Sequence, residues 1–147
     1  MVGTICYISY WSLYCIWSFN CKYDKFIMTK EERRLLLVDL SARFPYNVAV
    51  DCRSENSRFT CYLTSDMLRE IQNNTSWWEY KPYLFPLSSM TEEQKEEYKS
   101  FFPMLPRDLI TPSLSVKMID WLNANHFDYR GLIEKELAIN ATGLNIY

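Results

Sequence analysis

The sequence predicts an α+β fold in which a small, mostly antiparallel sheet packs with about four helices. Two stretches alternate between apolar and polar residues, as strands do, and only the polar residues 53–57 separate them. Two capping boxes and one well-placed proline mark the starts of longer helical segments. Strands do not alternate regularly with long helices along the chain, which argues against a parallel βαβ design.

Helices are predicted where a capping signal precedes an apolar stripe. Thr29 with Glu32 forms the pattern of a capping box, and Pro45 ends the helix that follows. Thr91 with Gln94 forms a second capping box ahead of a mostly charged segment. The four predicted helices span residues 30–43, 91–102, 112–125 and 129–138.

Strands are predicted from alternation and from β-branched or aromatic residues. Val48 and Val50 point to one side of the first strand, and the polar linker after it indicates a hairpin. Residues 64–74 fit either a loop or a short helix, and Pro82 with Pro86 predicts an extended but irregular segment. The three predicted strands lie near residues 47–52, 58–63 and 76–81.

If the hairpin loop is centred on residues 56 and 57, we expect Cys52 to lie opposite Cys61. Two interpretations follow: a redox pair or cross-strand disulfide, and two half-buried thiols in a sheet. Because disulfides are rare in cytoplasmic proteins, we expect the thiols to be reduced.

The first 27 residues differ from the rest of the chain, which we expect to form a single globular α+β domain over residues 28–147. No charged residue precedes Lys22, and residues 5–19 are apolar and aromatic. Three interpretations remain open for residues 1–27: a start codon assigned too early, a weak inner-membrane anchor, and a cleaved signal. The first is favoured because Met28 directly precedes a clean helix start.

Composition excludes several classes of function. Three scattered glycines are too few for a phosphate-cradling loop. The chain has a single histidine, and its five cysteines include no Cys-x-x-Cys pair, so we expect no metal site. We also expect no cofactor. Only Lys22, Lys25 and Asp24 are charged residues before Met28, so residues 28–147 carry 14 basic and 17 acidic residues. This net charge of −3 gives no general attraction to nucleic acid.

The best candidate for a chemical site lies at residues 123–130, between two predicted helices. His126 with Asp128 has the composition of a general base oriented by a carboxylate. Asn123, Asn125 and Arg130 are candidate binding residues beside them. The structural alternative is preferred: His126 suits the end of a helix, and Asp128 suits the cap of the next one.

Trp77 and Trp78 are a second candidate binding site, because adjacent indoles can form a platform. Adjacent residues of a strand face opposite sides, so we expect one indole to pack in the core while the other shields the sheet.

Residues 81–93 (KPYLFPLSSMTEE) and 120–135 (DWLNANHFDYRGLIEK) resemble a set of small uncharacterised proteins of gut Bacteroidales genomes and their phages. Such proteins typically begin with a Met-Thr-Lys-Glu-Glu-like start, which matches Met28. The resemblance implies a bacterial cytoplasm or a mobile element, and it carries no activity or site residue.

The sequence therefore favours a non-enzymatic interaction or regulatory protein in the cytoplasm, with a protein partner. This expectation rests on the missing catalytic motifs and on the 16% aromatic content, since aromatic residues serve interfaces as well as cores. The alternatives are a small enzyme using His126 and Asp128, and a protein tethered to the membrane through residues 5–19.

Overall fold

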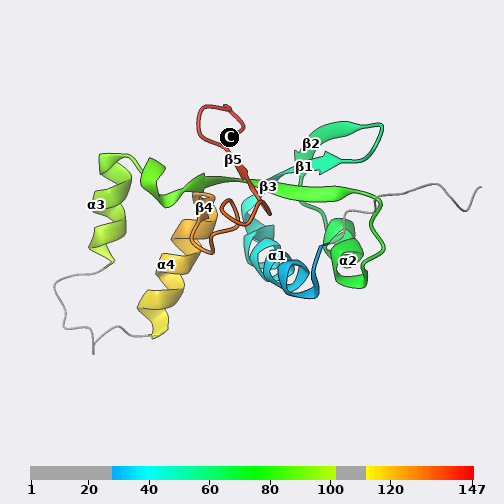
Figure 1. The fold of residues 1–147 in the computed structure, drawn as a ribbon. Helices are drawn as coiled ribbons and strands as arrows, with labels where there is room; N and C mark the ends of the chain where they lie inside the picture. Colours follow the sequence, from blue (N-terminus) through cyan, green and yellow to red (C-terminus); the bar gives the residue numbers. More distant parts are fainter. Residues whose placement is uncertain (1–27, 102–111) are drawn as a thin grey trace, which may run out of the picture.

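The computed structural model describes residues 28–101 and 112–147, which are arranged around one long strand, β3 (Glu79–Pro86) (Figure 1). The strand order is β2-β1-β3-β4, and β5 also pairs with β3. Strand β1 is antiparallel to β2 and β3, whereas β4 and β5 run parallel to β3. The remaining strands are β1 (Ala49–Arg53), β2 (Arg58–Tyr62), β4 (Phe127–Asp128) and β5 (Ile139–Asn140).

The helices begin where the sequence places their caps. The Thr29 hydroxyl accepts the Glu32 N–H, the Glu32 carboxylate accepts the Thr29 N–H, and Thr91 with Gln94 repeats this arrangement. Thr64 caps the short helix in the segment that the sequence left open. In the described part of the chain the helices are α1 (Lys30–Arg43), α2 (Ser65–Asn73), α3 (Glu92–Ser100) and α4 (Pro112–Ala124), with short 3-10 turns η1 (Phe44–Tyr46) and η2 (Leu87–Ser89).

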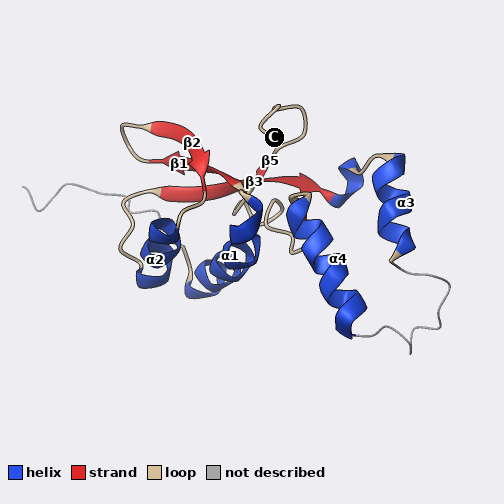
Figure 2. Cartoon of the chain, turned by 180° about the vertical axis from the view of Figure 1, so that it is seen from behind, coloured by secondary structure: helices blue, strands red, loops and turns tan. Residues whose placement is uncertain are grey.

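The largest apolar cluster lies between the sheet and helices α1 and α2, which cover one face (Figures 1 and 2). Residues 139–147 lie on the opposite face of the sheet, where Ala141 packs on Ala49 and Tyr83 in a smaller cluster. The buried residues of the main cluster are Leu36, Leu40, Val48, Val50, Cys52, Leu63, Ile71, Tyr80, Leu84, Leu132, Leu137 and Ala138.

The third strand differs from its prediction near residues 76–81, because β3 begins only at Glu79 and runs on through Pro82 to Pro86. The Tyr147 hydroxyl accepts the Ala49 N–H and donates to the Tyr83 C=O, so the backbone of Tyr83 faces β1. Neighbouring strand residues direct their backbone groups to opposite sides, so Pro82 faces away from β1. On that side β5 pairs only from Tyr83 onward, and the missing N–H of Pro82 breaks no ladder bond.

The predicted helix at residues 129–138 is wrong, because the structure has a series of turns there. Gly131 and Glu136 have positive φ angles of 70° and 57°, which a right-handed helix excludes. Leu132 and Leu137 are nevertheless buried in the main cluster, and the Leu137 N–H donates to the Leu132 C=O. The apolar residues of the segment therefore reach the core without a helical stripe.

Within the described residues, the structure contains no helix with the length and apolar character needed to cross a membrane. Residues 1–27, including the apolar stretch 5–19, lie outside the part of the chain that the structure describes.

Tyr147→Phe tests the bridge between β1 and β3. The ring would keep its place, while the Ala49 N–H and the Tyr83 C=O would lose their shared partner. We expect the free energy of unfolding to fall by about 1–3 kcal/mol, measured by urea denaturation. Tyr62→Phe is the matched control because Tyr62 is 62% exposed, and it should change stability by less than about 0.5 kcal/mol. Equal effects of the two substitutions would contradict this role of the bridge.

Candidate functional site

Helix α4 ends in a left-handed turn that aims the chain into β4. The Asn125 N–H and side-chain amide both donate to the Trp121 C=O at 3.0 Å, and the His126 N–H donates to the Asn123 C=O at 3.1 Å. His126 has a φ angle of 57°, the conformation that commonly ends a helix. Asn125 and His126 therefore occupy the helix end that the sequence predicted for them.

Asp128 uses its carboxylate to hold the turn that follows β4. One oxygen accepts the N–H groups of Arg130 (3.3 Å) and Leu132 (2.9 Å), and the other accepts the Ile133 N–H (2.8 Å). This is the capping chemistry expected of Asp128, although no helix follows it. None of these hydrogen bonds joins Asp128 to His126, so the carboxylate does not orient the imidazole.

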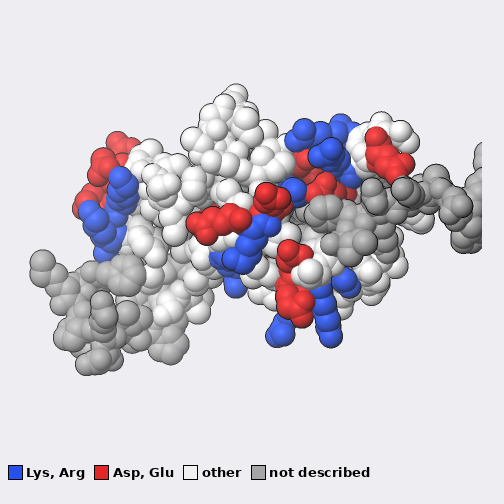
Figure 3. Space-filling model, in the orientation of Figure 1, with Lys and Arg blue, Asp and Glu red and all other residues white. Residues whose placement is uncertain are grey.

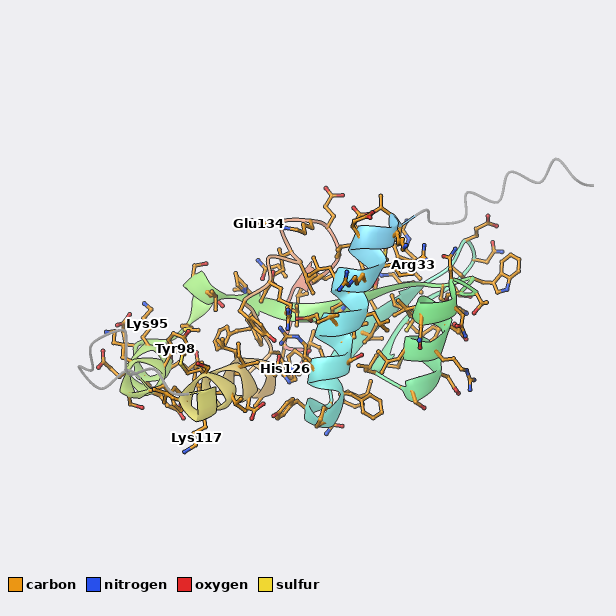
Figure 4. All side chains as sticks on the ribbon, turned by 90° about the horizontal axis from the view of Figure 1, so that it is seen from below. Arg33, Lys95, Tyr98, Lys117, His126 and Glu134 are labelled. Atoms are coloured by element: carbon orange, nitrogen blue, oxygen red, sulfur yellow. The ribbon has the colours of Figure 1, made fainter. Side chains whose placement is uncertain are left out.

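His126 is buried beside α1, near the end of α4 (Figure 4), and it contacts Tyr147. Its ring stacks on the Tyr147 ring with centroids 3.9 Å apart and planes 13° apart, and its Nδ1 atom is buried without a hydrogen-bond partner. Burial lowers the pKa of His126 to about 4, and the nearby positive charge of Arg43 adds to the effect. The imidazole is therefore neutral at pH 7, and the hydrogen bond to a carboxylate that orients a general base is missing.

A wholly buried ion pair lies next to this joint. The Arg43 Nε and Nη2 atoms donate to the two carboxylate oxygens of Asp39 at 2.7 and 3.2 Å, and both side chains are 0% exposed. The Arg43 Nη2 atom also donates to the Phe127 C=O at 2.7 Å. Helix α1 is thus bonded directly to the backbone of β4.

Tyr129 collects the remaining polar side chains of the cluster. The guanidinium carbons of Arg43 and Arg130 lie 5.4 and 5.0 Å from its ring centroid, within reach of cation–π attraction. Its hydroxyl donates to Asn123 Oδ1 at 3.1 Å. Arg130 Nε is 3.4 Å from the nearer oxygen of Asp39, an ion-pair contact without hydrogen-bond geometry. The structure therefore brings Asn123, His126 and Arg130 together around a buried ion pair.

Sequence reasoning missed the three partners that organise this cluster, namely Asp39, Arg43 and Tyr147. A signal for two of them was present. Asp39 and Arg43 are spaced four residues apart and fall on the same helix stripe as Leu36 and Leu40, which are buried. Charged residues on an apolar stripe predict burial with a partner.

Trp77 and Trp78 lie elsewhere, just before the first residue of β3, whereas β4 pairs with its last residues. Trp78 packs against the main cluster and meets the Phe59 ring edge to face at 5.2 Å. Trp77 is 77% exposed. One indole therefore faces the core and the other is exposed, although both residues precede β3 and neither lies in a strand.

In comparisons with known proteins, no family model, curated protein or solved structure matches the chain.

Among the described residues, no group of three or more His, Cys, Asp or Glu side chains is placed to hold a metal ion. Residues 123–130 connect α4 to β4 and to the turns that follow. The side-chain hydrogen bonds of this segment hold the backbone or a neighbouring side chain in place.

Asp39→Asn tests the buried ion pair. Removing one charge leaves the Arg43 guanidinium buried and uncompensated, so we expect a loss of about 3–5 kcal/mol in the free energy of unfolding. Asp66→Asn is the control, because the Asp66–Arg69 pair is exposed at 71% and 70% and should contribute less than about 1 kcal/mol. Urea denaturation of both variants gives the comparison. Similar losses would show that Arg43 does not depend on Asp39.

A second prediction concerns pH. In the unfolded chain His126 takes a proton near pH 6.5, but in the folded chain burial and Arg43 delay protonation to about pH 4. The unfolded state binds more protons between these values, so stability falls as the pH is lowered. We expect a loss of about 2 kcal/mol from pH 7.5 to 5, measured by denaturation at each pH.

His126→Asn is the control for this titration. Asparagine tolerates the left-handed conformation of residue 126 and does not titrate. Its stability should be nearly constant over the same range. A variant that loses as much stability as the wild type would assign the pH dependence to other groups.

Proposed function

We propose that this chain acts by binding another protein rather than by catalysis, and that the partner adds an extended segment to the outer edge of β2. The observation that carries the proposal is the exposure of β2, a five-residue edge strand in which only Cys61 is partly buried. Unpaired backbone groups along such an edge are a template for another strand.

The register identifies the backbone groups that are available. Just beyond β2, the Leu63 N–H donates to the Val48 C=O, and within β2 Cys61 lies opposite Val50. The backbone groups of Cys61 and Leu63 therefore face β1. The backbone groups of Arg58, Thr60 and Tyr62 therefore point outward, away from the sheet.

Side chains beside this edge match the chemistry of a protein interface. Phe59 is 48% exposed on one side of the strand, next to Trp78, and Tyr62 is 62% exposed on the other. Aromatic residues are enriched at interfaces, and the strand has no lysine or proline to discourage pairing. The partner segment that fits is extended, with apolar side chains placed against Phe59 and Tyr62.

Charge supports a protein partner over a nucleic acid. Lys and Arg side chains lie beside Asp and Glu side chains in the view of Figure 3, without one large field of a single sign. Arg58, which projects from β2, is bonded to Asp51 at 2.8 Å. A cytoplasmic location belongs to the same proposal and is supported by the free thiols of Cys52 and Cys61.

Thr60→Pro tests the proposed edge. The substitution removes an outward-facing N–H and leaves the β1–β2 ladder in place, so we expect the affinity for the partner to fall about tenfold or more. Thr60→Val is the matched control: it keeps the N–H and loses only the hydroxyl, which lies 3.3 Å from the Tyr83 hydroxyl. It should bind within about twofold of the wild type.

The experiment begins with proteins recovered from the native host on the full-length chain. Recombinant forms of these proteins are then titrated against the wild type and both variants, whose folding is checked by circular dichroism. Hydrogen exchange should show new protection at the amides of Arg58, Thr60 and Tyr62 in the complex. Equal affinity for Thr60→Pro and the wild type, or protection confined to α3 and α4, would reject the proposal.

A further inference from the structure

The β1–β2 hairpin holds two cysteine sulfurs in contact, apart from the cluster at the end of α4. The Sγ atoms of Cys52 and Cys61 are 3.2 Å apart, and neither residue is in a disulfide. A disulfide bond is about 2.0 Å long, so closure requires the two sulfurs to move about 1 Å closer.

The register explains this proximity. The predicted pairing of Cys52 with Cys61 is wrong, because Cys52 lies opposite Phe59 and Cys61 lies opposite Val50. The two cysteines are instead diagonal neighbours on the face covered by α1 and α2. Their environments differ. Cys52 is 0% exposed in the main cluster, whereas Cys61 is partly exposed on the edge strand.

We propose that Cys52 and Cys61 form a reversible redox pair that is oxidised by a low-molecular-weight disulfide. In the first step the Cys61 thiolate attacks one sulfur of the small disulfide, whose S–S bond breaks and releases one small thiolate. In the second step Cys52 loses its proton, and its sulfur attacks Cys61 Sγ. The mixed S–S bond breaks, and the second small thiolate leaves with the electron pair and takes up a proton. Two protein thiols are oxidised to one disulfide, and one small disulfide is reduced to two thiols.

The different solvent exposure of the two cysteines determines which of them reacts first. A dissolved disulfide reaches the partly exposed Cys61, whereas Cys52 is closed off by the core. Burial raises the pKa of Cys52 to about 12, and contact with Cys61 contributes to the shift. Cys52 is therefore a poor first nucleophile, but it lies beside Cys61 Sγ and serves as the resolving thiol.

The test uses the full-length chain with oxidised glutathione as the probe, followed by alkylation of free thiols and tryptic digestion without reduction. Arg53 and Arg58 lie between the two cysteines, so cleavage places them on separate peptides that only a disulfide joins. We expect the Cys52–Cys61 linked peptides to exceed every other disulfide of these two residues about tenfold. Dithiothreitol should restore both thiols.

Single substitutions separate the roles of the two cysteines. Cys52→Val, a small apolar replacement for a strand, should accumulate glutathione on residue 61 because the resolving thiol is missing. Cys61→Ser should leave Cys52 unmodified over the same time. Unfolding the wild type in urea should remove the preference for the Cys52–Cys61 pairing, because the hairpin no longer holds the sulfurs together.

Three results would overturn the proposal. They are a stable glutathione adduct on Cys61 of the wild type, pairing of Cys61 with a cysteine of the first 27 residues, and no reaction under conditions that modify Cys61 in the unfolded chain. Because the readout is the linkage between two peptides, the result does not depend on whether β2 binds a partner.

Discussion

The arrangement of the described residues depends on the buried ion pair between Asp39 and Arg43 and on its bond to the Phe127 C=O. A buried pair contributes little stability compared with apolar residues of the same shape, but breaking one partner is costly. Such a pair acts mainly as a constraint, since any other docking of α1 leaves a guanidinium buried without its acceptors. It therefore fixes which turn of α1 meets β4.

Several contacts follow from this constraint. With Phe127 held by Arg43, β4 pairs with the end of β3, and the His126 C=O accepts the Phe85 N–H at 2.9 Å. That position presents the His126 ring to Tyr147, whose hydroxyl in turn bridges β1 and β3. Tyr147 thus connects the turn between α4 and β4 to the centre of the sheet. A neutral imidazole suits this place, because a second positive charge beside Arg43 would be repelled.

The sequence predicted the local features well, because their causes are local. Both capping boxes form as expected, and α1 covers the predicted residues 30–43. The helix predicted at 129–138 was wrong. The Asp128 carboxylate accepts the N–H groups of Leu132 and Ile133, which in a helix would instead donate to backbone C=O groups four residues earlier. The spacing of Asp39 and Arg43 on an apolar stripe is a local signal for their pairing. The bond from Arg43 to the Phe127 C=O could not be predicted, because Phe127 is 84 residues from Arg43 along the chain. The tolerance of Pro82 within β3 likewise depends on the sheet pairing. Its missing N–H would point toward β5, which pairs with β3 only from Tyr83 onward.

The two proposals for the β1–β2 hairpin use different atoms of the same strand. The outward backbone groups of β2 belong to Arg58, Thr60 and Tyr62, whereas the backbone of Cys61 faces β1 and its side chain faces the helices. A Cys52–Cys61 disulfide therefore leaves the edge of β2 open. It also ties β2 to β1 and restricts the hairpin, so less conformational entropy is lost when a partner strand docks. On these physical grounds, oxidation of the thiol pair favours binding at the edge rather than blocking it.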